Sequence, residues 1–491
     1  AQQLYAHQLR NFDKYQFDVQ NADSIFGLLG TIHELPEATA QTDTFWIHNR
    51  HVPLKEKESA LDDLLAQLRK VPAFNVIIKT AEILITGYIP TTADKDKSKF
   101  DFGPMNTTFS ANHLEGFRMR VGGMTTANLN PHWFGSGYLA YGVNDRKLKY
   151  NAKLTYSVNK KKYHEGESPV NNISAIQEYD VYTPGQDFLF TSKDNMFVAW
   201  KVGEPVTMMQ YIRKTMLQYQ KEWLNGLTLT TWARNENNEA AGTLRYDRYD
   251  ADGTLTNLKS FTNTELGTQL RFAPGERAYN GREGKNSLFN LSKDAPVFKL
   301  SHQMGLKNVL GSDFNYNHTE ISAEKRIWLS SFGHIDALVT AGKVWDKVPF
   351  PLLIMPNTNQ SITIQPQAFN MMRALEFVSD QYVSFYFTYY MKGWILNRIP
   401  GVKWLRLREV ISFSGFYGGL TDKNNPALDP TGLYRFPEGT SPMGRTPYLE
   451  ASVGLENIFK ILRIDYYRRL TYLDQPNIKK GGVRIALRFS F

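Results

Sequence analysis

The chain has 491 residues, a formal net charge of +9 and no cysteine. A chain without cysteine has no disulfides, no thiol catalysis and no cysteine metal site. The basic residues are spread along the sequence rather than gathered in one block, so the charge does not indicate a nucleic-acid-binding protein. A lumen lined by Lys and Arg, or a face towards acidic lipid head groups, explains the positive sign better.

Composition is also compatible with a membrane barrel. Mean hydropathy is −0.41 and aromatic residues make up 13% of the chain. A barrel exposes only alternate wall residues to lipid, so its average is polar, and it uses aromatic residues at both membrane interfaces. No uninterrupted apolar run reaches the about 18 residues of a transmembrane helix. The start at Ala1-Gln2-Gln3 fits a mature chain cleaved after a small residue.

Residues 1–100 differ from the rest of the chain. A polar, proline-containing connection at 45–58 leads into Leu61, Leu64, Leu65 and Leu68, which recur at helical spacing. We expect an amphipathic helix and a second apolar segment at 72–84, packed under or into the barrel mouth. Binding to a membrane surface is the alternative.

From about residue 101 the sequence alternates between apolar and polar residues, the period of β-strands with one apolar face. Several stretches reach the roughly 9 to 11 residues that a tilted strand needs to cross lipid. The predicted strands are 116–121, 133–142, 147–158, 227–235, 267–272, 298–306, 333–345, 383–396, 404–420, 448–457, 461–472 and 481–491.

The connections between these strands are of two kinds. Long loops are expected at 159–172, 236–258, 273–296, 346–381 and 421–446, and short turns elsewhere. Long loops on one side and short turns on the other are typical of outer-membrane barrels, whose strand number is even. We therefore predict an all-β fold, a transmembrane antiparallel β-barrel of about 16 strands, with both termini in the periplasm.

The last predicted strand carries the clearest pattern. Val483, Ile485 and Leu487 alternate with Arg484 and a small alanine, and the pattern continues through Phe489 to Phe491. We expect this strand to close the barrel by pairing with the first strand near residues 102–109, because an unpaired edge in lipid is prohibitive.

The sequence resembles an uncharacterised outer-membrane family of Bacteroidota, whose members often carry a carboxypeptidase-regulatory-like domain ahead of the barrel. The resemblance rests on FWIHNRHVPL, on FDFGPMNTTFSANHLEGFRMRVGGMTT, and on residues 332–353, 367–387, 399–415, 447–478 and the final strand. In such barrels Phe489 and Phe491 resemble the carboxyl-terminal signal that hands the protein to the assembly machinery.

The last six predicted strands also resemble, more distantly, the surface-antigen superfamily of BamA, TamA and two-partner secretion transporters. There a long loop folds inward and carries an arginine, and the matching position here is Arg373. A buried arginine needs a carboxylate or carbonyl partner. Glu376, Asp380 and Glu409 are the candidates, and the sequence leaves the choice open.

No catalytic motif or metal-binding spacing is present, and the ten histidines are scattered singly. We therefore predict a protein that is not an enzyme, with no cofactor and no metal. The Glu376 and Asp380 pair suits a salt partner for Arg373 better than acid–base work.

Three functional hypotheses follow. The first is a non-enzymatic outer-membrane barrel in biogenesis or translocation, working with other outer-membrane or periplasmic proteins and in contact with outer-membrane lipid or lipopolysaccharide. The second is a passive or selective pore for anionic solutes. The third is a soluble β-rich protein. We favour the first, with residues 1–100 as a periplasmic helical and linker region and residues 101–491 as the barrel.

Overall fold

The computed structural model describes residues 45, 71–72, 76, 80, 83, 87–92, 94, 97–202, 205–276, 278–280, 288–290, 294–476 and 478–487. Most of the predicted N-terminal helical region, and Phe489 and Phe491, therefore lie outside the described residues. In the described part, no helix is long and apolar enough to span a membrane.

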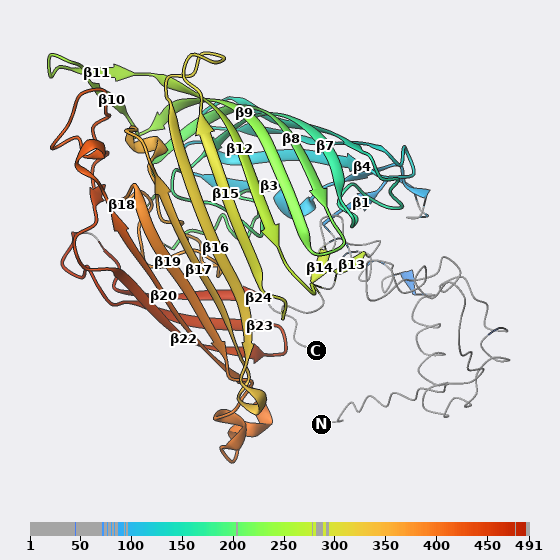
Figure 1. Ribbon diagram of the computed structural model, residues 1–491. Coiled ribbons are helices and arrows are strands. Elements are labelled where there is room, and N and C mark those ends of the chain that lie inside the picture. The colour runs from blue at the N-terminus through green and yellow to red at the C-terminus, as the bar shows by residue number, and fades with distance from the viewer. Residues whose placement is uncertain are drawn as a thin grey trace.

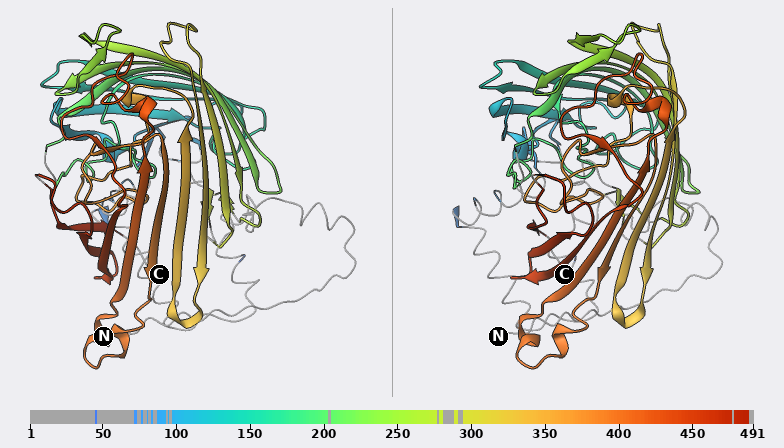
Figure 2. Two further views of the ribbon diagram at one scale, coloured as in Figure 1. Left: turned by 60° about the vertical axis from the view of Figure 1, so that its left-hand side comes forward. Right: turned by 90° about the vertical axis from the view of Figure 1, so that its left-hand side faces the viewer.

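One large antiparallel sheet dominates the structure, which confirms the all-β prediction at that level (Figure 1). The strands follow one another in chain order around a curved wall, and from β4 to β24 each is hydrogen-bonded to the next one in the sheet (Figure 2). Its strands are β1 (Ile89–Pro90), β2 (Phe100–Phe102), β3 (Phe109–Asn112), β4 (Gly116–Thr125), β5 (Trp133–Gly142), β6 (Leu148–Ser157), β7 (Asn171–Tyr182), β8 (Met208–Glu222), β9 (Leu227–Gly242), β12 (Ser260–Phe272), β15 (Val297–Gly305), β16 (Tyr316–Trp328), β17 (His334–Val344), β19 (Gln381–Tyr390), β20 (Arg408–Gly419), β22 (Tyr448–Ile458), β23 (Leu462–Arg469) and β24 (Gly481–Leu487).

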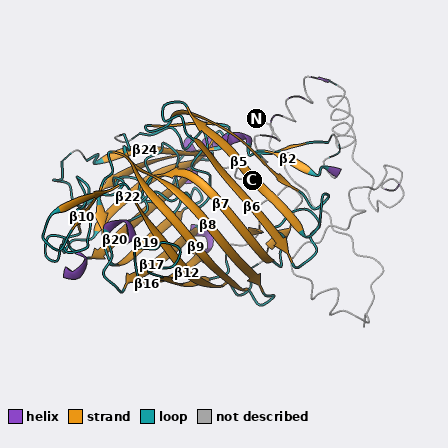
Figure 3. Cartoon of the chain, turned by 90° about the horizontal axis from the view of Figure 1, so that it is seen from above, coloured by secondary structure: helices purple, strands orange, loops and turns teal. Residues whose placement is uncertain are grey.

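Smaller elements lie in the connections between these strands. They are the two-stranded pairs β10 (Tyr246–Tyr249) with β11 (Leu255–Leu258), β13 (Ala278–Asn280) with β14 (Leu288–Asn290) and β18 (Phe377–Val378) with β21 (Ser441–Pro442), and the 3-10 turns η2 (Met105–Thr107), η3 (Ser330–Phe332), η4 (Phe350–Leu352), η5 (Leu396–Arg398), η6 (Val402–Leu405) and η7 (Asp422–Asn424). Viewed from above, tilted strands make up most of the structure and loops gather at its rims (Figure 3).

The wall has the polarity of a membrane barrel: apolar side chains point outward and charged ones point inward. On β4, Phe117 and Val121 are 48% and 66% exposed, whereas Arg118 between them is 0% exposed. The same inversion recurs along the sheet, with exposed Leu217, Ile321 and Val453. Because burying one such apolar side chain is worth about 1.5–3 kcal/mol, a water-facing wall of this kind would be costly.

Four long connections lie together on one side of the sheet, at residues 183–207, 243–259, 345–380 and 420–447. The opposite edge has the short connections 223–226, 329–333 and 459–461, but also the longer ones 158–170, 273–296 and 391–407. The prediction that all long loops lie on one side is therefore wrong for two of them, those expected at 159–172 and 273–296.

Leu244, Tyr246, Phe350 and Tyr434 from the connections on the first side join Phe261 of the wall in one buried cluster. The loops are thereby packed into a cap rather than left free.

Three of the long wall strands, β7, β8 and β16, were not predicted from the sequence. Polar residues stand on both faces of β8, where Arg213 and Thr215 take outward positions, so the period of two is blurred there. Two predicted strands were too long: β19 ends at Tyr390 and β20 begins at Arg408. Positive φ angles at Gly393 and Gly401 bend the chain between them away from an extended path.

The predicted closure of the barrel is not what the structure shows. Among the described residues, β24 pairs with β23 and with no part of the first strand. We call the space between β24 and the first strand, made of β2 and β3, the seam. At Ile485 the free edge of β24 pairs with a loop segment instead.

Candidate functional site: two inner loops at the seam

The free edge of β24 is covered by the β17–β19 loop, residues 345–380. The Ile364 N–H donates to the Ile485 carbonyl oxygen at 2.8 Å, and the Ile485 N–H donates to the Ile362 carbonyl oxygen at 2.9 Å. Thr363 thus lies beside Ile485 in a parallel bridge. Buried backbone donors and acceptors must be paired, so this loop segment replaces part of the missing strand.

A second loop continues the seal. We call residues 183–202 and 205–207 the β7–β8 loop and, with the β17–β19 loop, refer to the two as the inner loops. The Val202 N–H donates to the Gln360 carbonyl oxygen at 3.0 Å, and the Ile362 N–H donates to the Trp200 carbonyl oxygen at 2.7 Å. Further along, the Met196 N–H donates to the Asn106 carbonyl oxygen at 2.9 Å. Since Asn106 lies between β2 and β3, the inner loops span the seam in series.

The β17–β19 loop is anchored to the wall by a fully buried ion pair. Arg469 of β23 donates from Nη2 and Nη1 to the two carboxylate oxygens of Glu376, at 2.6 and 3.0 Å. Both side chains are 0% exposed. The guanidinium also lies 4.9 Å from the ring centre of Tyr448. A two-pronged contact of this kind holds the loop in both position and orientation.

A second attachment lies one strand away, on β22. The Glu450 carboxylate accepts hydrogen bonds from the backbone N–H groups of Asn370 at 2.9 Å and Met371 at 2.9 Å. Arg484 of β24 donates to the Asn370 carbonyl oxygen at 2.6 Å. Three wall strands therefore grip the same turn of the loop, just before the segment that carries Glu376.

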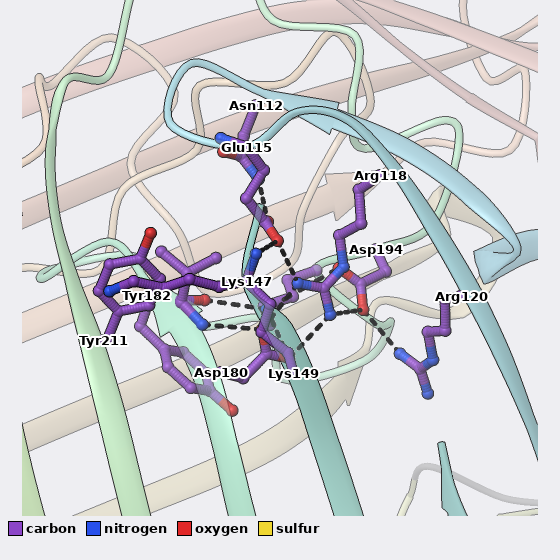
Figure 4. A network of polar contacts seen from close by, with 12 residues as sticks. Asn112, Glu115, Arg118, Arg120, Lys147, Lys149, Asp180, Tyr182, Asp194 and Tyr211 are labelled. Carbon is purple, nitrogen blue, oxygen red and sulfur yellow. Dashed lines mark hydrogen bonds and ion pairs between the residues drawn. The ribbon is translucent and has the colours of Figure 1, made fainter. Parts of the chain in front are cut away.

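The β7–β8 loop is anchored on the other side of the seam, where buried charges meet (Figure 4). Arg118 of β4 contacts Glu115 at 2.8 Å, Asp180 of β7 at 2.7 Å and Asp194 of the loop at 3.2 Å. Arg120 reaches the same Asp194 at 2.8 Å. The loop joins this network through Asp194 and through the neighbouring Lys193, which contacts Asp180.

The wider network is balanced in charge. Lys149 contacts Glu115 at 2.7 Å and Asp145 at 2.5 Å, and Lys193 contacts Asp180 at 2.9 Å. We define the β4 charge cluster as Glu115, Arg118, Arg120, Asp145, Lys149, Asp180, Lys193 and Asp194. Four basic groups face four acidic ones, so the cluster can be buried without a net charge.

The comparisons with known proteins place the chain in a family. Residues 81–424 match the family model described as the C-terminal domain of a family of unknown function, DUF5686. The chain belongs to the DUF5686 family. The predicted resemblance to an uncharacterised family is thereby confirmed. A search of curated proteins found no match to the sequence.

Solved structures that match the chain include BamA and two CdiB proteins. BamA from Haemophilus ducreyi lacking POTRA domains 1–3 matches with a TM-score of 0.49 and 9% identity, over 84% of this chain and 78% of that one. CdiB from Acinetobacter baumannii matches with a TM-score of 0.36 and 12% identity, over 77% of this chain and 58% of that one. CdiB from Escherichia coli matches with a TM-score of 0.41 and 10% identity, over 76% of this chain and 59% of that one. The chain thus spans less than two thirds of either CdiB.

The residues proposed from the DUF5686 sequence occupy three different places. Glu376 lies in the loop anchor, bound to Arg469, and its carboxylate also accepts the backbone N–H of Arg373 at 2.9 Å. Asp380 accepts hydrogen bonds from the Thr421 N–H at 3.0 Å and from Asn424, and so ties two loops together. Glu409 lies at the other end of β20, where it accepts the Ile395 N–H at 3.2 Å.

Arg373 is half-buried in the β17–β19 loop, and within the described ranges no ion pair reaches its guanidinium. The arginine that meets Glu376 comes from the wall instead. Neither Arg469 nor Glu450 was singled out from the sequence, although both stand at polar positions of recognisable strands. An inward-facing charge on an alternating strand can be recognised in the sequence as a candidate anchor. Its partner, about 80 to 90 residues away, cannot be identified in the same way.

In the described part of the chain, no group of three His, Asp or Glu side chains could hold a metal ion. The buried charges are engaged in ion pairs and hydrogen bonds that hold loops to strands. What the site can do physically is keep a seam closed, and release it if the loops move.

Proposed function

We propose that the protein is an integral outer-membrane β-barrel that acts in membrane biogenesis or translocation, as a non-enzymatic component of a larger assembly. Outward apolar and inward charged side chains support the membrane setting. The long connections at one edge support an outward-facing cap, with the N-terminus in the periplasm.

The strand pattern supports a barrel of 16 wall strands. β2 and β3 both pair with β4, at residues 123–125 and 116–119, so they are two halves of one interrupted strand. Counting them together and leaving out the two-residue β1 turns the 18-stranded sheet into a 16-stranded wall. An even number is expected of a bacterial single-chain barrel.

The observation that carries the proposal is the seam closed by the inner loops. A passive pore needs a free lumen and a wall that pairs with itself. Here the last strand instead offers its edge to a loop segment held by only a few backbone hydrogen bonds. Release of residues 357–366 and of the β7–β8 loop would free both the strand edge and the lumen, while the anchor at Arg469 stays in place.

The alternative of a pore for anionic solutes is not favoured by the interior. A cavity between the wall and the inner loops is lined by four acidic residues, Asp187, Glu236, Glu265 and Glu320, and by one guanidinium, that of Arg234. The basic lumen expected from the net charge is therefore not what surrounds this cavity. Acidic walls repel anions.

Locking the inner loops to each other tests the proposal. Lys201 and Ser361 face each other in an antiparallel bridge, flanked by the hydrogen bonds of Val202 and Ile362. Directly opposed residues of this type lie about 4.5 Å apart at Cα, which suits a disulfide. The chain has no cysteine, so Lys201→Cys with Ser361→Cys creates the sole thiol pair.

Cells whose only copy carries this pair should show a leaky outer membrane and reduced levels of outer-membrane proteins, reversed by a reductant. The matched control is Leu455→Cys with Ile464→Cys, a pair across β22 and β23 that no opening step needs to separate. Locked cells that behave as the control would contradict the proposal. So would a stable open conductance of the locked protein in planar bilayers.

A further inference from the structure

One interior cavity has features of a ligand site that the seam does not require. It has a volume of about 450 Å³ and lies between the inner loops and the inward faces of strands β8 to β20. Small-molecule sites in proteins usually occupy about 300–1,000 Å³. The cavity is therefore large enough for one organic molecule.

The charge around the cavity is strongly unbalanced. Its lining carries four carboxylates and a single guanidinium, an excess of three negative charges when His318 is neutral. Arg234 serves two of the acids, Glu265 at 2.8 Å and Glu236 at 3.6 Å. The rest of the negative charge has no cation in the lining, in contrast to the balanced β4 charge cluster.

Asp187 and Glu320 are the two acids without an ion pair among the described residues. Glu320 accepts one hydrogen bond, from the Tyr382 hydroxyl at 2.7 Å. Asp187 belongs to the β7–β8 loop, and its backbone, not its carboxylate, is bound to Asn357. The Asp187 side chain is exposed, so its carboxylate is accessible to a cation that enters the cavity.

Unmatched polar atoms and aromatic rings complete the lining. Asn263 is 3% exposed, and neither its Oδ1 nor Nε2 of His318 has a hydrogen-bond partner among the described residues. A buried polar atom left unpaired is costly, so these atoms are poised to accept or donate a hydrogen bond. Tyr382, Tyr386 and Phe416 also line the cavity, and aromatic rings attract organic cations.

We propose that this cavity binds a small organic cation that bears two or more ammonium groups, a polyamine. Its ammonium groups would lie against Asp187 and Glu320, which come from the β7–β8 loop and from β16. Its methylene chain would lie along the tyrosine and phenylalanine rings. Bound in this way, the ligand would hold the β7–β8 loop to the wall.

Calorimetric titration of spermidine into the full chain in non-ionic detergent tests the proposal. Saturable binding is expected, weakened about tenfold or more in Asp187→Asn with Glu320→Gln, because both charge contacts are lost. Asp252→Asn with Glu438→Gln removes two exposed carboxylates outside the cavity lining and should bind as the wild type does. Asp187→Asn alone changes only the loop and leaves the wall intact. It therefore tests the loss of one charge contact even if the double variant misfolds.

Two results would overturn the proposal. One is equal binding by the wild type and both cavity variants, which would make the interaction a surface one. The other is saturation by Mg²⁺ or by the neutral polyol triethylene glycol with none by spermidine, which would exclude an organic cation. Neither result bears on the seam, because the disulfide lock between the inner loops is read without any ligand.

Discussion

Each inner loop brings an acid to a wall arginine, but the two arginines differ in whether they have other acidic partners. The β7–β8 loop lends an acid, Asp194, to wall arginines, and Arg118 keeps Glu115 and Asp180 even without it. The β17–β19 loop brings Glu376 to Arg469, and the described residues provide that arginine with no other acid. The wall can thus spare the first loop but not the second.

This difference indicates which part of the seal can move. Taking the β17–β19 loop out would leave Arg469 and Glu450 buried without their partners, a cost of several kcal/mol for each charge. Releasing the β7–β8 loop removes Asp194 from the wall arginines and Lys193 from Asp180, one charge of each sign, so the wall charges of the β4 charge cluster stay balanced. The account therefore assigns opening to the β7–β8 loop and residues 357–366, and keeps residues 369–380 fixed.

The largest effect is expected from Arg469→Ala. It leaves Glu376 as an unpaired buried charge, which typically costs about 3–5 kcal/mol. Thermal unfolding in detergent, followed by the shift in gel mobility on heating, should occur at a clearly lower temperature. Removing both charges in Arg469→Met with Glu376→Leu should recover much of the loss, and a double variant no better than Arg469→Ala would contradict this reading.

A smaller effect on stability is expected from Asp194→Asn, about 1–3 kcal/mol, since charge-assisted hydrogen bonds are lost but Arg118 keeps two acids. Its main consequence should be local. Limited proteolysis should cut more readily within residues 183–202, while residues 369–380 stay protected. Equal exposure of both loops would remove the distinction between them.

Arg373→Ala should cost less again, under about 1 kcal/mol, because its guanidinium is half-buried and takes part in no ion pair in the described part of the chain. The sequence assigned the anchoring role to this arginine, and that role stays a prediction. Protease sensitivity of residues 345–380 in Arg373→Ala, compared with Arg469→Ala, decides between the two arginines. Equal loosening would restore the sequence assignment.

The smallest effect is expected at the rim. Arg435 and Asp247 form an ion pair at 2.6 Å between two loops, with the arginine side chain 56% exposed. Exposed pairs contribute about 0–1 kcal/mol, and salt screens them. Asp247→Asn should leave the unfolding temperature and both inner loops unchanged, and it serves as the baseline for the three variants above.

The fold could be predicted from the sequence where each strand has one apolar and one polar face. Residues 133–142 and 448–457 show that pattern and coincide closely with β5 and β22. β8 and β16 carry polar residues on both faces, so no period marked them. The long loop at 346–381 was also visible, because the alternation stops there.

The site could be predicted only in part, for a physical reason. Glu376 and Asp380 stood out as acids in a long loop, yet their partners Arg469 and Asn424 are chosen by the curvature of the sheet. The β4 charge cluster joins residues more than 70 positions apart, as in Arg118 with Asp194. Its members look like ordinary strand and loop charges until the wall brings them together.

The covered edge of β24 is the central claim, and disulfide mapping in native membranes tests it most directly. Ile485→Cys combined with Thr363→Cys should form an intramolecular disulfide, because these residues are bridge partners. Ile485→Cys combined with Phe109→Cys or Ala111→Cys of β3 should not. Cross-linking of Ile485→Cys to β3 with none to Thr363→Cys would show a barrel closed on itself and would contradict the account.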